Sequence, residues 1–381
     1  MKKILVVHNR YRLQGGEDIA VSNEITALQS LYEVETLIFE NNKINVISDL
    51  INFVLNKNLK SANKLINKLE SFNPDFVYVH NTWFKASVII FDVLEKRNIK
   101  TVIKLHNFRY DCTRHFFYKG HIKQQNMCSR CGALKKENKL FNKYFQESFI
   151  KSLLVIRYGK KFYKKIQNKN VKLLVLTKFH KNYLQNLGFD SRNIKILPNP
   201  SVNTVIENKQ KSNSLVYAGR ISKEKGVKEL IDAFINAKTL NINLLLIGSG
   251  PELSYLKKLY KNENNIKFMG QLDNEKVKEI ILKARAVVTA TKLFEGQPTL
   301  LCEASSMKTP SIFPRFGGIH EFFPPESKLS FQQYDYQDLT QKIRLIDKSD
   351  FADEGIENEK YYLKHFDKNN FSKKILEIFY D

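Results

Sequence analysis

The sequence has few cysteines and no long apolar run. Four cysteines in 381 residues are too few for a disulfide framework. No apolar stretch approaches the roughly 20 residues that cross a bilayer. Near the N-terminus, the apolar run Ile4–Val7 is too short for the apolar region of a signal peptide. We therefore expect a cytoplasmic protein.

Acidic residues are scarce in one part of the chain. Residues 101–200 hold 22 Lys and Arg against 4 Asp and Glu, whereas residues 201–381 hold 27 against 24. This asymmetry indicates an anionic partner, either an acidic membrane surface or nucleic acid, unless the lysines only solubilise the chain. Residues 133–170 mix apolar side chains with lysines, which favours a membrane surface. A core helix with a solvated lysine face would show the same pattern.

Short apolar runs alternate with helix-length amphipathic segments along the whole chain, as in the strand Phe76–Val79 and the helix Ala86–Lys96. Such alternation predicts parallel sheets with helices on both faces. LPNPS at 197–201 interrupts it. We expect an α/β protein with two Rossmann-like domains, residues 1–200 and 201–360, that face each other across a cleft. A C-terminal helix over residues 361–381 is expected to return to the first domain.

The stretch FEGQPTLLCE (294–303) holds two glutamates eight positions apart. Proline is favoured at the first position of a helix, so a helix should start near Pro298. Glu295 then lies in the loop that follows a strand at Ala286–Thr289, and Glu303 lies inside the helix. The amides around Gly296–Leu300 would form an anion site. The alternative is one helix with both glutamates on a solvated face.

Two further glycine-containing turns follow predicted strands. YAGRISKEKG (217–226) carries Arg220 and Lys225, a pair suited to a diphosphate, although an exposed charged turn is the alternative. IGSGPE (247–252) contains Gly248 and is a weak signal by itself. In the first half, strand ends place Asn81 and His106–Arg109 at the sheet edge, where α/β proteins bind ligands.

Taken in order, GGED (15–18), GRISKEKG, IGSGPE, FEGQPTLLCEA and FGGIHEF (316–322) resemble the GT-B glycosyltransferases of the retaining family 4 type. HNFRYDC (106–112) is similar to a subset from bacterial surface-polysaccharide pathways (capsule, O-antigen or exopolysaccharide). The resemblance implies a GT-B fold with an N-terminal acceptor-binding domain and a C-terminal nucleotide-sugar-binding domain. It also implies transfer of a hexosyl or N-acetylhexosaminyl group with retention of the anomeric configuration.

The resemblance assigns roles to individual residues. Glu295 and His106 would lie by the donor sugar as catalytic residues, Arg220 and Lys225 would bind the diphosphate, and Glu303 the ribose. The donor-binding set is Gly15, Gly16, Arg220, Lys225, Gly248, Gly296, Pro298, Thr299, Leu300 and Glu303, and the acceptor side is Glu17, Asn81, Asn107 and Arg109. Gln297 departs from the family, which commonly has Phe there, and bears on donor choice.

Cys112, Cys128 and Cys131 match part of a zinc pattern, with His106, His115 or His121 as a fourth ligand, although three thiols in a loop are the alternative. Asp-x-Asp is absent from the sequence. We therefore expect no cofactor and no metal dependence. The expected partners are a nucleotide sugar, a lipid-linked or glycan acceptor and the anionic inner face of the plasma membrane, where the protein would be peripheral.

Two other functions compete with transfer. A nucleotide-sugar 2-epimerase has the same fold, but the two glutamates together with GR…EKG fit transfer better. A basic nucleic-acid-binding protein would use the first half of the chain, but clustered aromatic stacking motifs are not visible there. Nucleic acid is therefore not an expected partner.

Overall fold

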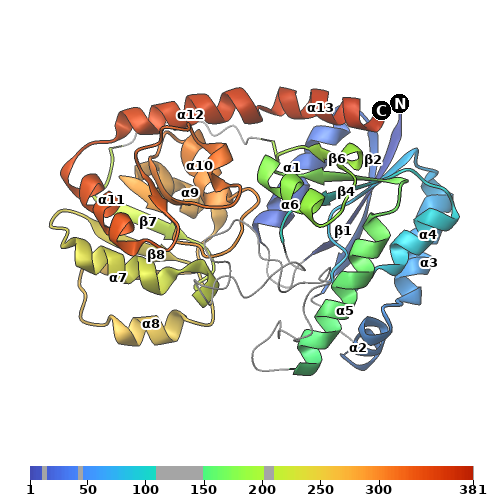
Figure 1. Ribbon diagram of the computed structural model, residues 1–381, viewed down its shortest axis with the longest axis horizontal. Helices are drawn as coiled ribbons and strands as arrows, with labels where there is room; N and C mark the ends of the chain where they lie inside the picture. The colour runs from blue at the N-terminus through green and yellow to red at the C-terminus, as the bar shows by residue number, and fades with distance from the viewer. Residues whose placement is uncertain (11–14, 42–45, 109–148, 201–209, 381) are drawn as a thin grey trace. The chain divides into compact units, whose positions relative to one another are not determined.

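The computed structural model describes the chain except residues 11–14, 42–45, 109–148, 201–209 and 381. The described residues form two compact units. The first contains the described chain up to Pro200 and also the C-terminal segment from Lys368, and the second contains the described residues between them up to Asp367. Each unit is a parallel sheet with helices on both faces (Figure 1), which confirms the predicted α/β class.

The first unit is built on parallel strands in the order β2-β1-β3-β4-β5-β6. Its strands are β1 (Lys3–Arg10), β2 (Glu33–Glu40), β3 (Phe76–Val79), β4 (Thr101–Leu105), β5 (Val171–Val175) and β6 (Ile194–Ile196). Its helices are α1 (Gly16–Gln29), α2 (Val46–Leu55), α3 (Leu59–Phe72), α4 (Ile89–Lys96), α5 (Phe149–Ile166), α6 (Lys178–Asn186) and α13 (Lys368–Tyr380). The strand order switches direction between β1 and β3, and ligands of α/β sheets bind beyond the strand ends at such a point.

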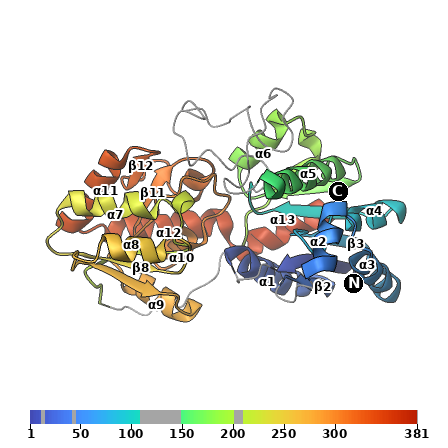
Figure 2. The same ribbon diagram turned by 90° about the horizontal axis from the view of Figure 1, so that it is seen from below.

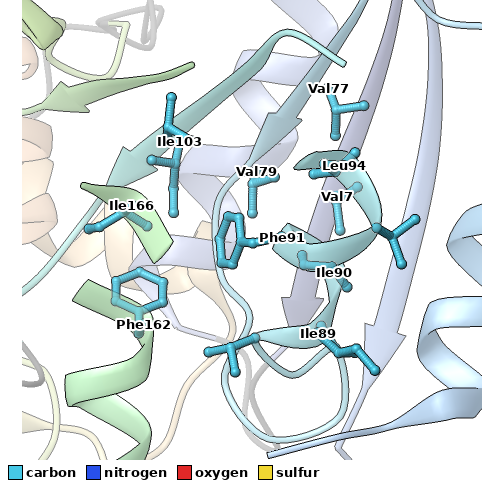
Figure 3. Close-up of a cluster of buried hydrophobic side chains, with 14 of the residues drawn as sticks. Val7, Val77, Val79, Ile89, Ile90, Phe91, Leu94, Ile103, Phe162 and Ile166 are labelled. Atoms are coloured by element: carbon cyan, nitrogen blue, oxygen red, sulfur yellow. The ribbon is translucent and has the colours of Figure 1, made fainter. Parts of the chain in front are cut away.

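Successive strand residues of this sheet point to opposite layers of the unit. Val7, Val79 and Ile103 belong to the layer covered by α3, α4 and α5. Figure 3 shows Phe91 of α4 and Phe162 of α5 beside these strand residues. Helix α5, which lies within the basic stretch 133–170, therefore buries one of its faces in the core.

The opposite layer packs Ile4, Phe76 and Val102 against α1 and α13. Figure 2 shows α13 beside α1. The C-terminal helix thus belongs to the first unit. Position 361, the predicted start of this helix, lies inside α12 (Ala352–Phe366), and α13 begins at Lys368.

The second unit has parallel strands in the order β12-β11-β10-β7-β8-β9. Its strands are β7 (Ser214–Ala218), β8 (Asn243–Ile247), β9 (Ile266–Gly270), β10 (Ala286–Val288), β11 (Ser311–Arg315) and β12 (Ser330–Gln332). Its helices besides α12 are α7 (Val227–Ala237), α8 (Leu253–Leu259), α9 (Asn274–Lys283), α10 (Thr299–Ser306) and α11 (Tyr336–Lys348). This is the strand order of dinucleotide-binding folds, with the switch between β7 and β10.

Alternation also divides the second sheet into two layers. Leu215, Leu244 and Ile312 pack with α7, α8 and α11, whereas Val216 and Val287 pack with α9, α10 and α12. Figure 1 shows α7 and α8 on one side of this sheet and α10 and α12 on the other. The loops after β7 and β10 therefore leave the sheet at one edge, next to each other.

A fully buried ion pair interrupts the apolar layer under α1 and α13. Lys104 Nζ of β4 donates to Glu24 Oε1 of α1, and both side chains have no exposed area. Tyr78 OH of β3 donates to Glu24 Oε2 at 2.6 Å. Burial lowers the pKa of Lys104, and the Glu24 carboxylate opposes that shift. Each charge has lost its water, so its partner is the main source of compensation.

Replacing Lys104 tests the cost of this burial. Lys104→Met keeps the length of the side chain but leaves the Glu24 carboxylate buried without its counter-charge. We expect the free energy of unfolding, measured by urea denaturation, to fall by about 3–5 kcal/mol. The control is Arg97→Met, which breaks the exposed ion pair between Arg97 and Glu70 (2.7 Å) and should cost less than about 1 kcal/mol. Similar losses in the two variants would contradict the account.

Candidate active site

A polar cluster lies where β7 and β10 end. A turn of 3-10 helix, Lys223–Lys225, follows β7. Lys225 Nζ donates to Glu295 Oε1 at 2.6 Å, and Thr291 Oγ1 donates to the same oxygen at 2.8 Å. The Lys225 side chain is 29% exposed and the Glu295 side chain 20%. The structure therefore brings the predicted diphosphate lysine and the predicted sugar-side glutamate into direct contact, and a ligand can still reach both.

Two glycines allow the loops of this site to pack backbone against backbone. A Cβ on Gly226, which has a φ of 66°, would lie 2.0 Å from Ala290 O in the loop after β10. A Cβ on Gly248 would lie 2.0 Å from Gly219 O in the loop after β7. No side chain fits at these distances. Gly248, predicted to bind the donor, therefore also fixes the β8 loop against the β7 loop.

The helix α10 begins just after Glu295. Pro298 is its N-cap, so the helix starts one residue later than the proline preference predicts. Leu301 and Cys302 donate their N–H groups to Pro298 O at 3.1 and 3.0 Å. The preceding amides, including those of Thr299 and Leu300, have no acceptor inside the helix and carry its partial positive charge. The same loop thus supplies both the Glu295 carboxylate and a set of N–H donors.

Glu303 lies one turn into α10 and is partly buried. Burial raises the pKa of its carboxyl group to about 7, because the charged form loses water. Lys278 of α9 opposes this shift, and Glu275 of α9 adds to it. The carboxyl group therefore changes charge near neutral pH and gains charge when a hydrogen-bond donor binds beside it. Glu295 and Glu303 do not share one solvated face, as the sequence predicts.

The loop that carries Glu295 is also held in place by residues outside the cluster. Lys292 Nζ pairs with Glu229 in the first turn of α7, and the Lys292 amide donates to Glu224 O at 2.9 Å. Gln333 Nε2 donates to Thr291 O at 3.1 Å. The sequence did not indicate these supporting residues, because no local motif predicts a contact between residues 63 positions apart, such as Lys292 and Glu229.

Arg220 lies on the β7 loop with an exposed side chain. Its carbonyl oxygen accepts a hydrogen bond from Tyr217 OH at 2.8 Å. Burial raises the pKa of Tyr217, with Glu295 adding to the shift, so this phenol stays neutral and keeps its donor role. Arg220 therefore belongs to the same loop as Lys225, where its guanidinium is open to an anionic ligand.

In the first unit, Asp18 ties the glycine turn to the end of β1. Its carboxylate accepts the Gly15 N–H at 3.0 Å and lies 2.9 Å from His8 Nε2. Gly15 is the N-cap residue of α1, and Gly16 is the first residue of the helix. The predicted phosphate-side glycines are thus anchored by two residues, His8 and Asp18, to which sequence reasoning gave no role.

His106 is partly buried beyond the end of β4. Its Nε2 lies 2.9 Å from Nδ1 of His80, which follows β3. Burial lowers the pKa of both imidazoles well below the ordinary value, and the Lys104 ammonium adds to the shift. The two rings are therefore neutral at physiological pH. A signal in the sequence could have indicated His8 as well, because a His-Asn pair follows β3 and β4 and also lies near the end of β1.

The predicted acceptor-side residues divide into two groups. Asn81 is buried, and its Nδ2 donates to Asn9 O at 2.9 Å. Asn81 therefore links the ends of β3 and β1. Asn107 Nδ2 donates to Glu17 Oε2 at 2.9 Å, and Asn107 is exposed. Asn107 and Glu17 are thus placed together and can reach a ligand.

Of the predicted zinc ligands, only His106 lies among the described residues. The others, Cys112, Cys128, Cys131, His115 and His121, lie outside them, as does Arg109. Within the part of the chain that the structure describes, no group of three or more His, Cys, Asp or Glu could hold a metal ion. In that same part, none of the helices has the length and apolar character needed to span a membrane.

The chain is similar in sequence to a glycosyltransferase family and to curated glycosyltransferases. The family model "Glycosyl transferases group 1" matches residues 202–361. TuaC of Bacillus subtilis, named as a teichuronic acid biosynthesis glycosyltransferase, is 30% identical over 128 residues, 34% of this chain and 31% of that protein. AmsD of Erwinia amylovora, an amylovoran biosynthesis glycosyltransferase, is 28% identical over 154 residues, 37% of this chain and 42% of that protein. The matches span less than half of either curated relative.

Comparison with solved structures concerns the fold. HepE of Anabaena in complex with UDP-glucose superposes with a TM-score of 0.69 at 15% identity, covering 99% of both chains. The fold is therefore the two-domain GT-B fold. The glycosyl transferases group 1 match falls on the second unit, and it contains Lys225, Glu295 and Glu303.

Proposed function

We propose that this protein is a retaining glycosyltransferase of the family 4 type. It would move a hexosyl or N-acetylhexosaminyl group from a nucleotide sugar to a glycan or lipid-linked acceptor in cell-surface polysaccharide synthesis. The observation that carries the proposal is the contact of Lys225 with Glu295 at the switch point of the second sheet. The names of TuaC and AmsD support the polysaccharide pathway, and the UDP-glucose complex of HepE supports the donor class.

The proposed reaction begins with an exchange of partners at Lys225. When the donor diphosphate enters, the Lys225 ammonium turns from the Glu295 carboxylate to the phosphate oxygens. Arg220 and the first amides of α10 add further positive charge. The bond between the anomeric carbon and the phosphate oxygen then breaks, and the nucleoside diphosphate leaves with the electron pair. This positive charge stabilises the leaving group, so we propose that transfer needs no metal or other cofactor.

Glu295 becomes available to the sugar through the same exchange. Its carboxylate loses the Lys225 ammonium and keeps Thr291 as a hydrogen-bond donor. An unneutralised carboxylate near the anomeric carbon stabilises the positive charge that develops there. The acceptor hydroxyl attacks the same face from which the diphosphate leaves, and the departing phosphate takes its proton. Retention of configuration follows from attack on that face.

Glu303 would accept hydrogen bonds from the ribose hydroxyls of the nucleotide. Its pKa of about 7 means that burial holds part of the population protonated at neutral pH. Ribose hydroxyls donate to the charged form, so nucleotide binding and proton loss are linked. The nucleotide should therefore bind more tightly as the pH rises through 7.

A surface of the first unit supports attachment to an anionic membrane. Its exposed apolar residues are Ile51, Leu55, Leu59, Ile150 and Leu153, from α2, α3 and α5. Phe53 of α2 stacks on Tyr158 of α5 with ring centroids 5.6 Å apart, so these two helices are neighbours. The exposed basic residues of α3 and α5 include Lys60, Arg157, Lys160 and Lys164, and Lys57 is exposed between α2 and α3. Exposed apolar and basic side chains on the same helices suit the interface of an acidic bilayer.

The proposed transfer is tested with purified protein and a panel of nucleotide sugars, measuring release of the nucleoside diphosphate. Lys225→Met should weaken binding of the diphosphate by about 1.5–3 kcal/mol, the value of a charged hydrogen bond. Glu295→Gln should do the opposite, because Lys225 is then free: diphosphate affinity should hold or rise while kcat collapses.

Lys223→Met is the matched control for these two variants. Lys223 is exposed in the same turn as Lys225, and its replacement should leave both binding and kcat near the original values. Equal diphosphate affinity in the Lys225→Met and Lys223→Met variants would place the diphosphate elsewhere. Conversion of the nucleotide sugar to an isomer without transfer would contradict the proposed reaction.

Glu303→Gln should stabilise the free protein and weaken nucleotide binding. The raised pKa means that the neutral carboxyl stabilises the fold at low pH and that this contribution is lost as the pH rises to about 7. Glutamine stays neutral, so above pH 7 we expect a gain of roughly 1–3 kcal/mol in stability. Thermal unfolding across pH and calorimetry with a nucleoside diphosphate measure the two effects. The control is Glu326→Gln, at an exposed position. If the Glu303 variant matches this control in both assays, Glu303 has no role in nucleotide binding.

Membrane attachment predicts binding to vesicles that depends on acidic lipid. Co-sedimentation with anionic vesicles should weaken as salt rises, since the attraction decays within a Debye length. The double variant Leu55→Ser/Leu153→Ser should bind several times more weakly. Leu240→Ser is the control, because Leu240 is 91% exposed in the second unit. Equal binding to neutral vesicles, or none to acidic ones, would exclude this surface as a membrane anchor.

A further inference from the structure

The hydrogen bond between His80 and His106 limits which nitrogen of His106 can carry a proton. Nδ1 of His80 lies 2.9 Å from Nε2 of His106. Two neutral imidazoles that share a hydrogen bond place one proton between these nitrogens. If His80 holds it, His106 must carry its own proton on Nδ1. If His106 holds it, Nδ1 of His106 is a bare acceptor and His80 must carry its proton on Nε2.

The surroundings of His80 Nε2 decide between these two arrangements. This nitrogen is buried and has no hydrogen-bond partner among the residues that the structure describes. A buried N–H without an acceptor is rarer in proteins than a buried acceptor without a donor.

The other groups around His80 do not offer an acceptor to Nε2. Tyr78 donates its hydroxyl to Glu24, and the Glu24 carboxylate also accepts from Lys104. The imidazole of His8 meets His80 edge to face with ring centroids 6.1 Å apart, and its Nε2 faces Asp18. The proton of His80 therefore lies on Nδ1, in the bond to His106.

We propose that His80 is a positioning residue that holds His106 as a neutral hydrogen-bond donor, with its N–H at Nδ1. This inference rests on the proposed glycosyl transfer and on the role beside the donor sugar that the family resemblance implies for His106. Nδ1 would donate to a sugar oxygen, and His106 would not act as a general base. A bare Nδ1 could only accept a hydrogen bond from a sugar hydroxyl, so the tautomer decides whether His106 donates to the sugar or accepts from it.

Nuclear magnetic resonance tests the tautomer without any substrate. Long-range proton–nitrogen correlation spectra of protein with ¹⁵N-labelled histidine distinguish protonated from bare ring nitrogens. His106 signals are assigned with the His106→Gln variant. We expect a protonated Nδ1 and a bare Nε2 for His106 near neutral pH. A bare Nδ1 in the unsubstituted protein would overturn the proposal, whatever reaction the enzyme proves to catalyse.

Two variants of His80 separate positioning from packing. His80→Asn can still donate from an amide near the place of Nδ1, whereas His80→Leu cannot. In the leucine variant we expect the proton of His106 to move to Nε2. We also expect kcat to fall about tenfold to a hundredfold, which is at or below the loss of kcat that follows removal of one preorganised hydrogen-bond donor. The asparagine variant should restore the Nδ1 tautomer and most of kcat. A leucine variant with unchanged tautomer and kcat would overturn the proposal. So would an asparagine variant that keeps its fold, as judged by thermal unfolding, but behaves like leucine.

Discussion

Parallel pairing of the strands is the constraint on which both candidate sites depend. In each sheet the described strands run in one direction, so all their carboxyl ends meet at one edge. Parallel pairing alone therefore brings together side chains that are far apart in sequence. Lys225 and Glu295 are 70 positions apart, and His80 and His106 are 26 positions apart, yet each pair lies within hydrogen-bond distance. The chemistry of both units follows from this convergence.

Alternation along the strands explains why polar groups in the first unit are buried as well as convergent. His8, Tyr78 and Lys104 occupy the same side of the sheet as the apolar residues Ile4, Phe76 and Val102. On each strand the two residues are two or four positions apart, and side chains at even spacings point to the same face. The apolar layer under α1 and α13 thus ends in a polar network below the strand ends. The Lys104–Glu24 pair keeps a positive charge in that network, which helps to hold the pKa values of His80 and His106 low. Stability and site chemistry use the same residues.

The sequence indicated the elements better than the contacts between them. Phe76–Val79 was predicted with the bounds of β3, because it is a buried run of apolar residues. β2 was not predicted, since at the sheet edge its glutamates face solvent and dilute the apolar signal. The motif around Glu295 indicated its loop, and Pro298 indicated the start of α10. The pairing of Lys225 with Glu295 and the contacts of Lys292 depend on residues far apart in the chain, and no local pattern encodes them.

In the proposed reaction, Lys225 exchanges the Glu295 carboxylate for the phosphates of a nucleotide sugar. A crystal structure of the protein with a nucleotide sugar tests this exchange most directly. We expect the diphosphate over the first amides of α10, with Lys225 Nζ within hydrogen-bond distance of a phosphate oxygen and no longer bound to Glu295. A diphosphate bound elsewhere, with the Lys225–Glu295 pair intact, would contradict it.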